Sequence, residues 1–179
     1  TVVRSPKSYN SQVGVPLSVF GSNENHTLGI FEAGVSTINE MENLQKIIQP
    51  KIGIFTHLGN AHDEGFSSEL EKIQEKIKLF KEAEIVILEK NEIIEKLLVS
   101  KTITWSFLDK KAAVFAEKEN QKNGFSLLSI YYKNTSFKVE IPFQDEASLA
   151  NAMTCICTLL HLKYKTNVIA ERIKNLYPV

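Results

Sequence analysis

The clearest evidence for the fold lies in residues 28–62, which read LGIFEAGVSTINEMENLQKIIQPKIGIFTHLGNAH. Two short apolar runs, at 28–31 and 52–55, each end in polar residues, and apolar residues at helical spacing lie between them. This strand–helix–strand order is the unit that builds parallel sheets, and its crossover is right-handed in nearly all proteins. We therefore expect an α/β fold in which both runs are strands of a parallel sheet.

The pattern continues toward the C-terminus. The helix between the first two strands is predicted at 36–49, where Thr37 and Glu40 fit a capping box and Pro50 ends the helix. The elements predicted next are a helix at 67–83, a strand at 84–88, a helix at 91–98 and a strand at 102–105. The alternation of strands and helices is typical of a sheet with helices on its faces.

The two ends of the chain differ from this region. Residues 1–12 are polar and resemble no strand, and a short helix is predicted at 14–21, with Pro16 in its first turn. The elements predicted after Leu108 are strands at 112–116, 126–132 and 136–141 and helices at 146–162 and 167–176. We expect a three-layer α/β domain whose mostly parallel sheet, flanked by helices, is extended by an antiparallel meander.

The composition bounds the class of protein. The chain has 179 residues, 43% of them hydrophobic, which suits one soluble globular domain covering residues 1–179. A formal net charge of zero provides no electrostatic footprint for nucleic acid. No apolar run could span a bilayer, and residues 1–12 lack a signal peptide's apolar core. Cys155 and Cys157, the only cysteines, lie in an apolar run, so we expect two buried thiols in a cytoplasmic protein.

Polar residues follow both of the first two strands. Ligands of open α/β sheets bind outside the carboxyl ends of the strands, where Glu32 and the loop from His57 to His62 are expected. A carboxylate there commonly holds magnesium beside phosphates, although a loop or helix-start carboxylate is an equal alternative. The imidazole of His62 could bind a metal or a water molecule, or stand in a solvated loop.

Two further residues have competing interpretations. Lys76 is predicted on the flank of the helix at 67–83, about a quarter turn from its apolar stripe, where it would be an ordinary snorkelling lysine. Lys72, Glu75 and Lys78 are also expected off that stripe. Asn151 interrupts an apolar helix, so we expect it to be buried and to hydrogen bond either a loop or a ligand.

Several catalytic motifs are absent from the sequence. It contains no G-x-x-x-x-G-K-S or G-x-x-x-x-G-K-T loop, which would cradle phosphates, no G-x-S-x-G elbow and no redox C-x-x-C. The spacings of common zinc sites are absent too. The residues alone therefore indicate an α/β protein with a candidate site, but no reaction.

The order of three segments resembles the central domain of Mur ligases. These segments are NSQVGVPLSVF (10–20), IFEAGVSTINEMENLQKIIQPKIGIFTHLGNAHDEGFSSELEKIQEK (30–76) and ASLANA (147–152). Within that family they are most similar to the type that adds D-alanyl-D-alanine to UDP-N-acetylmuramoyl-tripeptide, the MurF type. The resemblance covers nearly the whole chain and implies a fold like that of P-loop nucleoside triphosphatases.

The resemblance also implies an ATP-dependent ligase of peptidoglycan synthesis. In this family ATP phosphorylates a carboxylate of the precursor, and the amine of D-alanyl-D-alanine attacks the acyl phosphate to form an amide. Glu32 and His62 match magnesium-binding residues, and Lys76 matches a lysine whose carbamate helps to hold a second magnesium ion. Asn151 matches an asparagine that contacts adenine. The residues that correspond to the UDP-precursor side of the cleft are Asn10, Ser11 and Gln12.

The sequence departs from the family pattern in several places. His57 and Ser148 each stand where an asparagine is usual, and Lys78 stands where an acid is common. The missing phosphate loop lies in the family just before a segment like residues 1–12. We therefore expect a central-domain fragment that lacks the N- and C-terminal domains of its parent, and that folds but does not ligate. Some relatives are fused to an alanine racemase.

Two other functional classes stay open. One is a non-catalytic nucleotide-binding module, which an upstream phosphate loop in the parent would argue against. The other is a metal-dependent hydrolase that uses Glu32, His62 and Asp63. Tight retention of zinc would favour the hydrolase, whereas weak, nucleotide-dependent binding of magnesium would favour the ligase.

Overall fold

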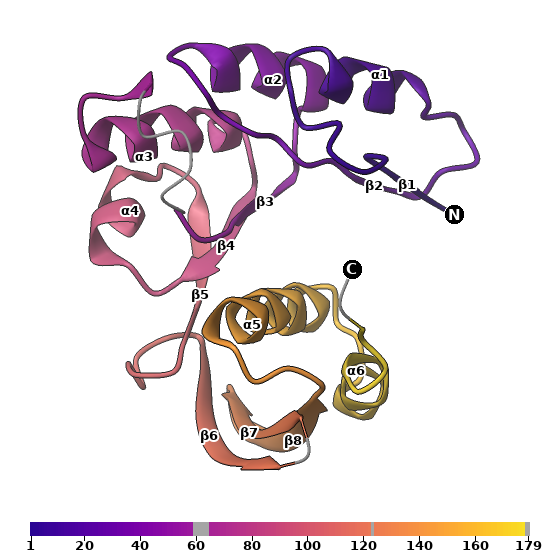
Figure 1. Cartoon of the computed structure of the whole chain (residues 1–179), viewed down its shortest axis with the longest axis vertical. Helices are drawn as coiled ribbons and strands as arrows, with labels where there is room; N and C mark the ends of the chain where they lie inside the picture. The colour runs from indigo at the N-terminus through magenta and orange to yellow at the C-terminus, as the bar shows by residue number, and fades with distance from the viewer. Residues whose placement is uncertain (59–64, 123, 178–179) are drawn as a thin grey trace. The chain divides into compact units, whose positions relative to one another are not determined.

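The structure is a computed structural model that describes residues 1–58, 65–122 and 124–177 (Figure 1). The chain forms two compact units. The first unit comprises Thr1–Gly53, Leu58–Glu84 and Lys96–Ser100. The second unit comprises Ile54–His57, Ile85–Glu95 and Lys101–Val179. Strands and helices alternate through the first half of the chain and a meander follows, so the predicted α/β class is confirmed.

A short parallel sheet belongs to the first unit. β1 (Val2–Arg4) pairs with β2 (Leu28–Ile30), with Val2 opposite Leu28. The prediction that residues 1–12 hold no strand is therefore wrong. Three residues are too few to show the alternation that identifies a strand, and β1 depends on a pairing partner far along the chain.

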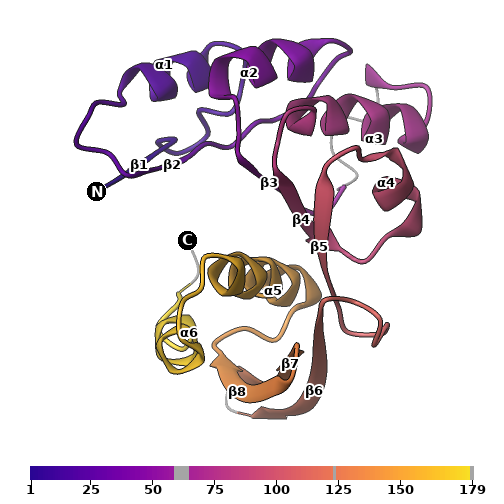
Figure 2. The same cartoon turned by 180° about the vertical axis from the view of Figure 1, so that it is seen from behind.

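Two helices lie side by side in the first unit, as Figure 2 shows. α1 (Gly14–Phe20) forms where predicted. α2 (Glu40–Ile48) begins later than predicted, because Asn39 has a left-handed backbone with φ of 71°. The Glu40 carboxylate accepts the Thr37 N–H at 3.0 Å, which is one half of the predicted capping box. One hydrophobic core cluster of the first unit is formed by the buried residues Val15, Val35, Met41 and Leu44.

A third helix completes the described part of the first unit. α3 (Glu69–Ile77) continues into the 3₁₀ turn η2 (Lys78–Phe80), within the range predicted for one helix. Ser68 caps α3, since its Oγ accepts the Glu71 N–H at 3.2 Å. The Glu71 carboxylate accepts the N–H of Ser67 in return at 2.6 Å.

The larger sheet has the strand order β3-β4-β5-β6-β7-β8. Its strands are β3 (Ile52–Phe55), β4 (Ile85–Glu89), β5 (Lys101–Ser106), β6 (Val114–Lys122), β7 (Phe125–Tyr132) and β8 (Thr135–Ile141). β5 pairs in parallel with both β4 and β6, whereas β6, β7 and β8 form an antiparallel meander. Both the parallel sheet and its antiparallel extension are as predicted.

The two strands that flank α2 belong to different sheets among the described residues. β2 pairs with β1, whereas β3 is an outer strand of the larger sheet. We expected both strands in one parallel sheet, and this part of the prediction is wrong for the described residues. Periodicity identifies strands but not their partners, which depend on contacts between distant segments.

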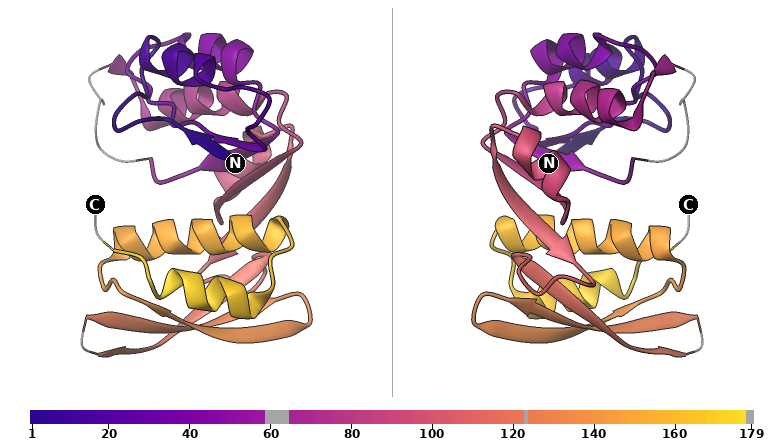
Figure 3. Two further views of the ribbon diagram at one scale, coloured as in Figure 1. Left: turned by 90° about the vertical axis from the view of Figure 1, so that its right-hand side faces the viewer. Right: turned by 90° about the vertical axis from the view of Figure 1, so that its left-hand side faces the viewer.

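Two helices cover one face of the meander, as Figure 3 shows. They are α5 (Glu146–His161) and α6 (Thr166–Ile173). Trp105, which is 2% exposed, joins sheet and helix, because its indole N–H donates to the Thr154 Oγ1 at 3.0 Å. Within the described ranges, no helix has both the length and the apolar character needed to cross a membrane.

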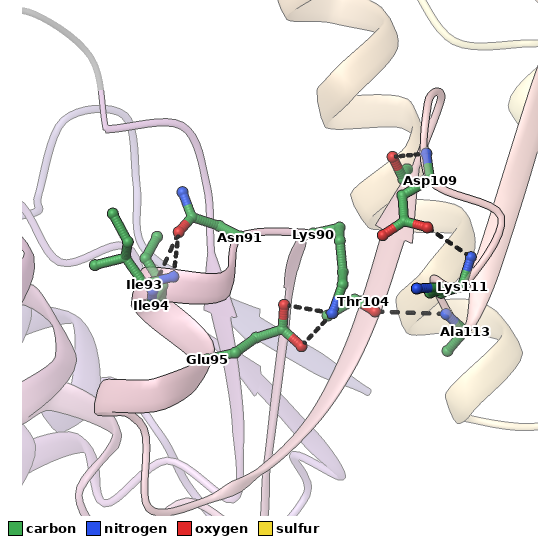
Figure 4. Close-up of polar contacts among 10 residues, drawn as sticks. Lys90, Asn91, Ile93, Ile94, Glu95, Thr104, Asp109, Lys111 and Ala113 are labelled. Atoms are coloured by element: carbon green, nitrogen blue, oxygen red, sulfur yellow. Dashed lines mark hydrogen bonds and ion pairs between the residues drawn. The ribbon is translucent and has the colours of Figure 1, made fainter.

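Figure 4 shows how side chains define the helix after β4. α4 (Glu92–Leu97) starts where Asn91 Oδ1 accepts the N–H groups of Ile93 and Ile94, at 3.0 and 3.1 Å. Lys90 and Glu95 form an ion pair of 2.9 Å across the first turns. Asn91 is therefore the cap of the predicted helix at 91–98, which confirms its beginning.

Candidate functional site

Glu32 lies at the carboxyl end of β2, where the sequence predicts a site. Its carboxylate Oε1 accepts a hydrogen bond of 2.9 Å from Asn10 Nδ2, and its N–H donates to Ser5 Oγ at 3.2 Å. The structure thus brings together two of the predicted site residues, Asn10 and Glu32. The Glu32 side chain is exposed, so its carboxylate can reach a ligand.

The glycine of the E-x-G motif lies against the same asparagine. The Gly34 N–H donates to the Asn10 carbonyl oxygen at 2.8 Å. A Cβ at Gly34 would lie 3.3 Å from both Cγ and Nδ2 of the Asn10 side chain. A larger residue at position 34 would therefore require the Asn10 side chain to move by a few tenths of an ångström.

Ser11 and Gln12 have structural contacts at the start of α1 and α2. Ser11 Oγ accepts the Gly14 N–H at 3.2 Å, and the Ser11 carbonyl oxygen accepts the Val15 N–H at 2.9 Å. Gln12 hydrogen bonds to the Glu40 carboxylate. Although burial opposes the change, this bond and those from the N–H groups of Ser36 and Thr37 lower the pKa of Glu40. The role of Ser11 and Gln12 on the substrate side of the cleft stays a prediction.

Lys76 reaches the loop that follows β3. Its Nζ donates a hydrogen bond of 3.2 Å to the carbonyl oxygen of Leu58, three residues beyond the end of β3. Burial, followed by the positive charge of Lys72, lowers the pKa of Lys76 from its ordinary value of 10.5. Lys76 is half-buried, as expected of a snorkelling lysine, and its lowered pKa distinguishes it from a lysine that is fully in water.

The helix that carries Lys76 buries charged residues. Lys72 is 3% exposed and Glu75 is 2% exposed, whereas both were expected off the apolar stripe. Glu75 Oε1 accepts the buried N–H of Met41 at 3.0 Å, and its Oε2 accepts from Lys78 Nζ at 2.6 Å. A position off the apolar stripe is therefore not an exposed one here, because α2 packs against α3, while Leu70, which belongs to the stripe, is 48% exposed.

The segments after β2 and before α3 lie in direct contact. Gly65 is the first described residue after residue 58, and a Cβ on it would lie 2.0 Å from the Ser36 carbonyl oxygen. Ser36 follows β2 in the same loop as Glu32. The segment that leads into the Lys76 helix therefore touches the loop that carries Glu32.

Three predicted or alternative site residues, Asn60, His62 and Asp63, lie outside the described residues. His57 is exposed in the second unit. Burial raises the pKa of Glu89, the charge of Glu146 adds to this, and the charge of His57 opposes it. In the part of the chain that the structure describes, no three His, Cys, Asp or Glu side chains group as metal ligands.

Asn151 lies on the exposed face of α5, in the second unit. The prediction of a buried asparagine is wrong because the helical period turns Leu149, Ala152 and Met153 into the core and leaves position 151 outside. Its side chain is available to a ligand. Cys155 is also exposed, contrary to expectation, whereas Cys157 is buried and burial raises its pKa to about 12.

Comparison with known proteins identifies relatives that cover most of the chain. Residues 1–159 match the family profile of the Mur ligase middle domain. A UDP-N-acetylmuramoyl-tripeptide–D-alanyl-D-alanine ligase from Borreliella burgdorferi is 28% identical over 180 residues, covering 90% of this chain and 36% of the relative. The chain spans roughly two fifths or less of the length of such relatives.

Solved structures share this fold. The structure of a MurF ligase from Thermotoga maritima in complex with ADP has a TM-score of 0.87 at 17% identity, covering all of this chain and 43% of that one. A structure of MurF from Acinetobacter baumannii has a TM-score of 0.87 at 18% identity, covering 99% of this chain and 40% of that one. At these identities the likeness establishes the fold.

Proposed function

The chain belongs to the Mur ligase family, as a middle domain, and on that basis we propose that it is the ATP-binding part of a larger cytoplasmic ligase. That ligase adds D-alanyl-D-alanine to UDP-N-acetylmuramoyl-tripeptide in peptidoglycan synthesis. The activity for which the relatives are named and the ADP complex of the Thermotoga maritima structure support this proposal. The N- and C-terminal domains of the same parent chain complete the substrate sites.

The proposed reaction joins two substrates through an acyl phosphate. The precursor carboxylate takes the terminal phosphoryl group of ATP, and the amine of D-alanyl-D-alanine then displaces phosphate to form an amide, losing its proton. Phosphoryl transfer of this kind depends on positioning and on neutralisation of charge. Bound Mg²⁺ supplies that neutralisation at the phosphates. Asn151 contacts the adenine from its exposed position on α5.

Glu32 has the chemistry of a magnesium ligand. Mg²⁺ prefers hard oxygen donors, and the Glu32 carboxylate is exposed and held in place by Asn10. His62 is proposed as a further ligand. The ammonium of Lys76 does not fit a cation site as it stands, but its carbamate would provide an anionic oxygen.

Lys76 has surroundings that favour a carbamate. The step joins the neutral amine nitrogen to the carbon of CO₂ and releases one proton to solvent, so it requires an amine with a lowered pKa. Burial and the charge of Lys72 lower the pKa of Lys76. The same charge of Lys72, which disfavours an ammonium at Lys76, favours a carbamate anion there.

The single observation that carries the proposal is the match of residues 1–159 to the Mur ligase middle domain. In the full-length ligase we expect Lys76→Ala to reduce ligation by at least about a hundredfold, and bicarbonate should not restore it, because no amine remains. Phosphate release with both substrates measures this. Lys81→Ala, an exposed lysine near the same helix, is the matched control. Full activity of the Lys76→Ala enzyme would remove Lys76 from the mechanism.

The chain alone is proposed to be inactive. Its sequence lacks the phosphate-cradling loop, so the backbone N–H groups and the lysine that normally hold the phosphates of ATP are not supplied by it. Calorimetry on the chain should therefore detect only very weak binding of Mg-ATP. Binding in the low micromolar range would contradict this part of the proposal.

A further inference from the structure

The second unit contains a hollow of about 500 Å³ where the turn between β7 and β8 meets the connection between α5 and α6. Of the described residues that line it, none is Asp or Glu. The basic and aromatic residues that line it are Lys133, His161, Lys163, Lys165, Tyr132 and Tyr164. Because the formal net charge of the chain is zero, this excess of positive charge is local. The hollow therefore suits an anion.

Two of these lysines occupy backbone positions that ordinarily favour glycine or asparagine. Lys133 has a φ of 52° in the turn between β7 and β8, and Lys163 has a φ of 63° just after α5. Tight hairpins and helix ends usually place glycine or asparagine at such positions, because a Cβ disfavours the left-handed conformation. Two separate turns thus place a lysine beside the same hollow against the backbone preference. Such residues concentrate at functional sites.

The aromatic residues narrow the class of ligand. Lys133 Nζ lies 5.0 Å from the centre of the Tyr132 ring, and Tyr164 is 53% exposed. A lysine binds phosphate as a point charge, whereas a tyrosine ring offers an apolar face to a flat ligand. The volume lies within the range of small-molecule sites. We propose that this hollow binds a mononucleotide, with the lysines on its phosphate and a tyrosine ring against its base.

This hollow is separate from the proposed adenine contact. Asn151 precedes His161 by ten residues on α5, which corresponds to about 15 Å along the helix axis. None of the residues that line the hollow is among those proposed for ligation. The inference therefore does not depend on the proposed function.

The test uses His161 as a local reporter. The chain has four histidines, so their ring signals can be resolved by nuclear magnetic resonance. Titration with AMP, without magnesium, should shift the signals of His161 and Tyr164 in a saturable way, while adenosine and inorganic phosphate shift them less. Added salt should weaken the binding of AMP, because the lysine heads are exposed to solvent.

A double variant removes charge without straining the fold. Lys133→Gly with Lys163→Gly should leave the chain as stable as before or more so, because glycine suits both left-handed positions. It should bind AMP about tenfold more weakly. Lys7→Gly is the matched control, since Lys7 has a φ of 46° in the first unit and does not line the hollow.

Three results would overturn the proposal. AMP at millimolar concentration could leave His161 unshifted, or the double variant could bind AMP as tightly as the original chain. A single-stranded oligonucleotide could also saturate the His161 shift where AMP does not, which would identify the hollow as part of a nucleic-acid surface.

Discussion

Glu32 and Glu75 are two carboxylates of the first unit, and the structure holds them in different ways. Glu32 is exposed and accepts one described side-chain hydrogen bond, from Asn10. Glu75 is 2% exposed, and its two oxygens accept from the N–H of Met41 and the ammonium of Lys78. A buried carboxylate whose oxygens are both engaged stabilises the packing around it, whereas an exposed carboxylate with one anchor keeps capacity for a ligand.

The same contrast explains the lysines near Glu75. Lys78 has a carboxylate partner at 2.6 Å, so its charge is compensated where it lies. Lys76 donates to a neutral carbonyl oxygen, and burial lowers its pKa. Burial disfavours the charged form of an amine, so it makes the Lys76 ammonium easier to deprotonate. The first unit thus contains both residues that stabilise the fold and residues that are suited to chemistry.

The largest expected effect is a difference in the free energy of unfolding between variants of the two carboxylates. Glu75→Ala would leave the buried N–H of Met41 without its acceptor and Lys78 without its partner. We expect the free energy of unfolding to fall by about 3 kcal/mol, measured by urea denaturation. Glu32→Ala should change it by less than about 0.5 kcal/mol, because that side chain is exposed. Equal losses in the two variants would remove the distinction between them.

A smaller effect is expected where the Glu32 loop meets the segment before α3. Gly65→Ala would place a Cβ 2.0 Å from the Ser36 carbonyl oxygen, so the two segments must move apart. We expect a loss of about 2 kcal/mol in the free energy of unfolding. Gly21→Ala is the control, because its φ is −72° and its nearest neighbouring atom would lie at 3.4 Å. An unchanged Gly65→Ala protein would show that this contact does not hold the loop.

Local sequence patterns predicted most of the elements that surround these two carboxylates. α1, the beginning of α4 and the meander carry their own signals in capping residues and alternation. β1 carries none, because three residues cannot show a period and its partner β2 is distant in sequence. The assignment of β2 and β3 to different sheets is a property of strand pairing, which periodicity does not specify.

The candidate site was predictable to the extent that it follows strand ends. Glu32 could be named from its place after an apolar run, and the likeness of the surrounding motifs added Asn10 and Lys76. The burial of Lys72 and Glu75 could not be predicted from the sequence, because it depends on how α2 packs against α3. The exposure of Asn151 depends on the rotation of α5, to which a single polar residue in an apolar run gives no guide.

The lowered pKa of Lys76 predicts that the stability of the fold depends on pH. Between the lowered pKa and the ordinary value of 10.5, the folded protein binds fewer protons at this site than the unfolded chain. Stability contributed by this site should therefore rise as the pH rises through that range. Lys76→Met should remove that rise, whereas Lys46→Met, at an exposed ion pair with Glu42, should keep it. Urea denaturation at a series of alkaline pH values measures the difference, and a rise that persists in Lys76→Met would assign it to another group.

The smallest expected change in stability concerns the anchor of Glu32. Asn10→Ala removes an exposed hydrogen bond, so the free energy of unfolding should fall by less than about 1 kcal/mol. It also frees the Glu32 carboxylate, and residues that orient a metal ligand typically change metal affinity by about tenfold or more. From the proposed role of Glu32 as a magnesium ligand, we expect that in the proposed full-length ligase the magnesium concentration needed for half-maximal activity rises about tenfold, while saturating magnesium restores most of the rate. Asn175→Ala, which removes a hydrogen bond of 2.9 Å to the Glu171 carbonyl oxygen at the end of α6, should leave that concentration unchanged. If both variants shift the magnesium dependence alike, Asn10 does not act through Glu32. The distinction between Glu32 as an anchored ligand and Glu75 as a buried structural carboxylate would then lose its support from Glu32.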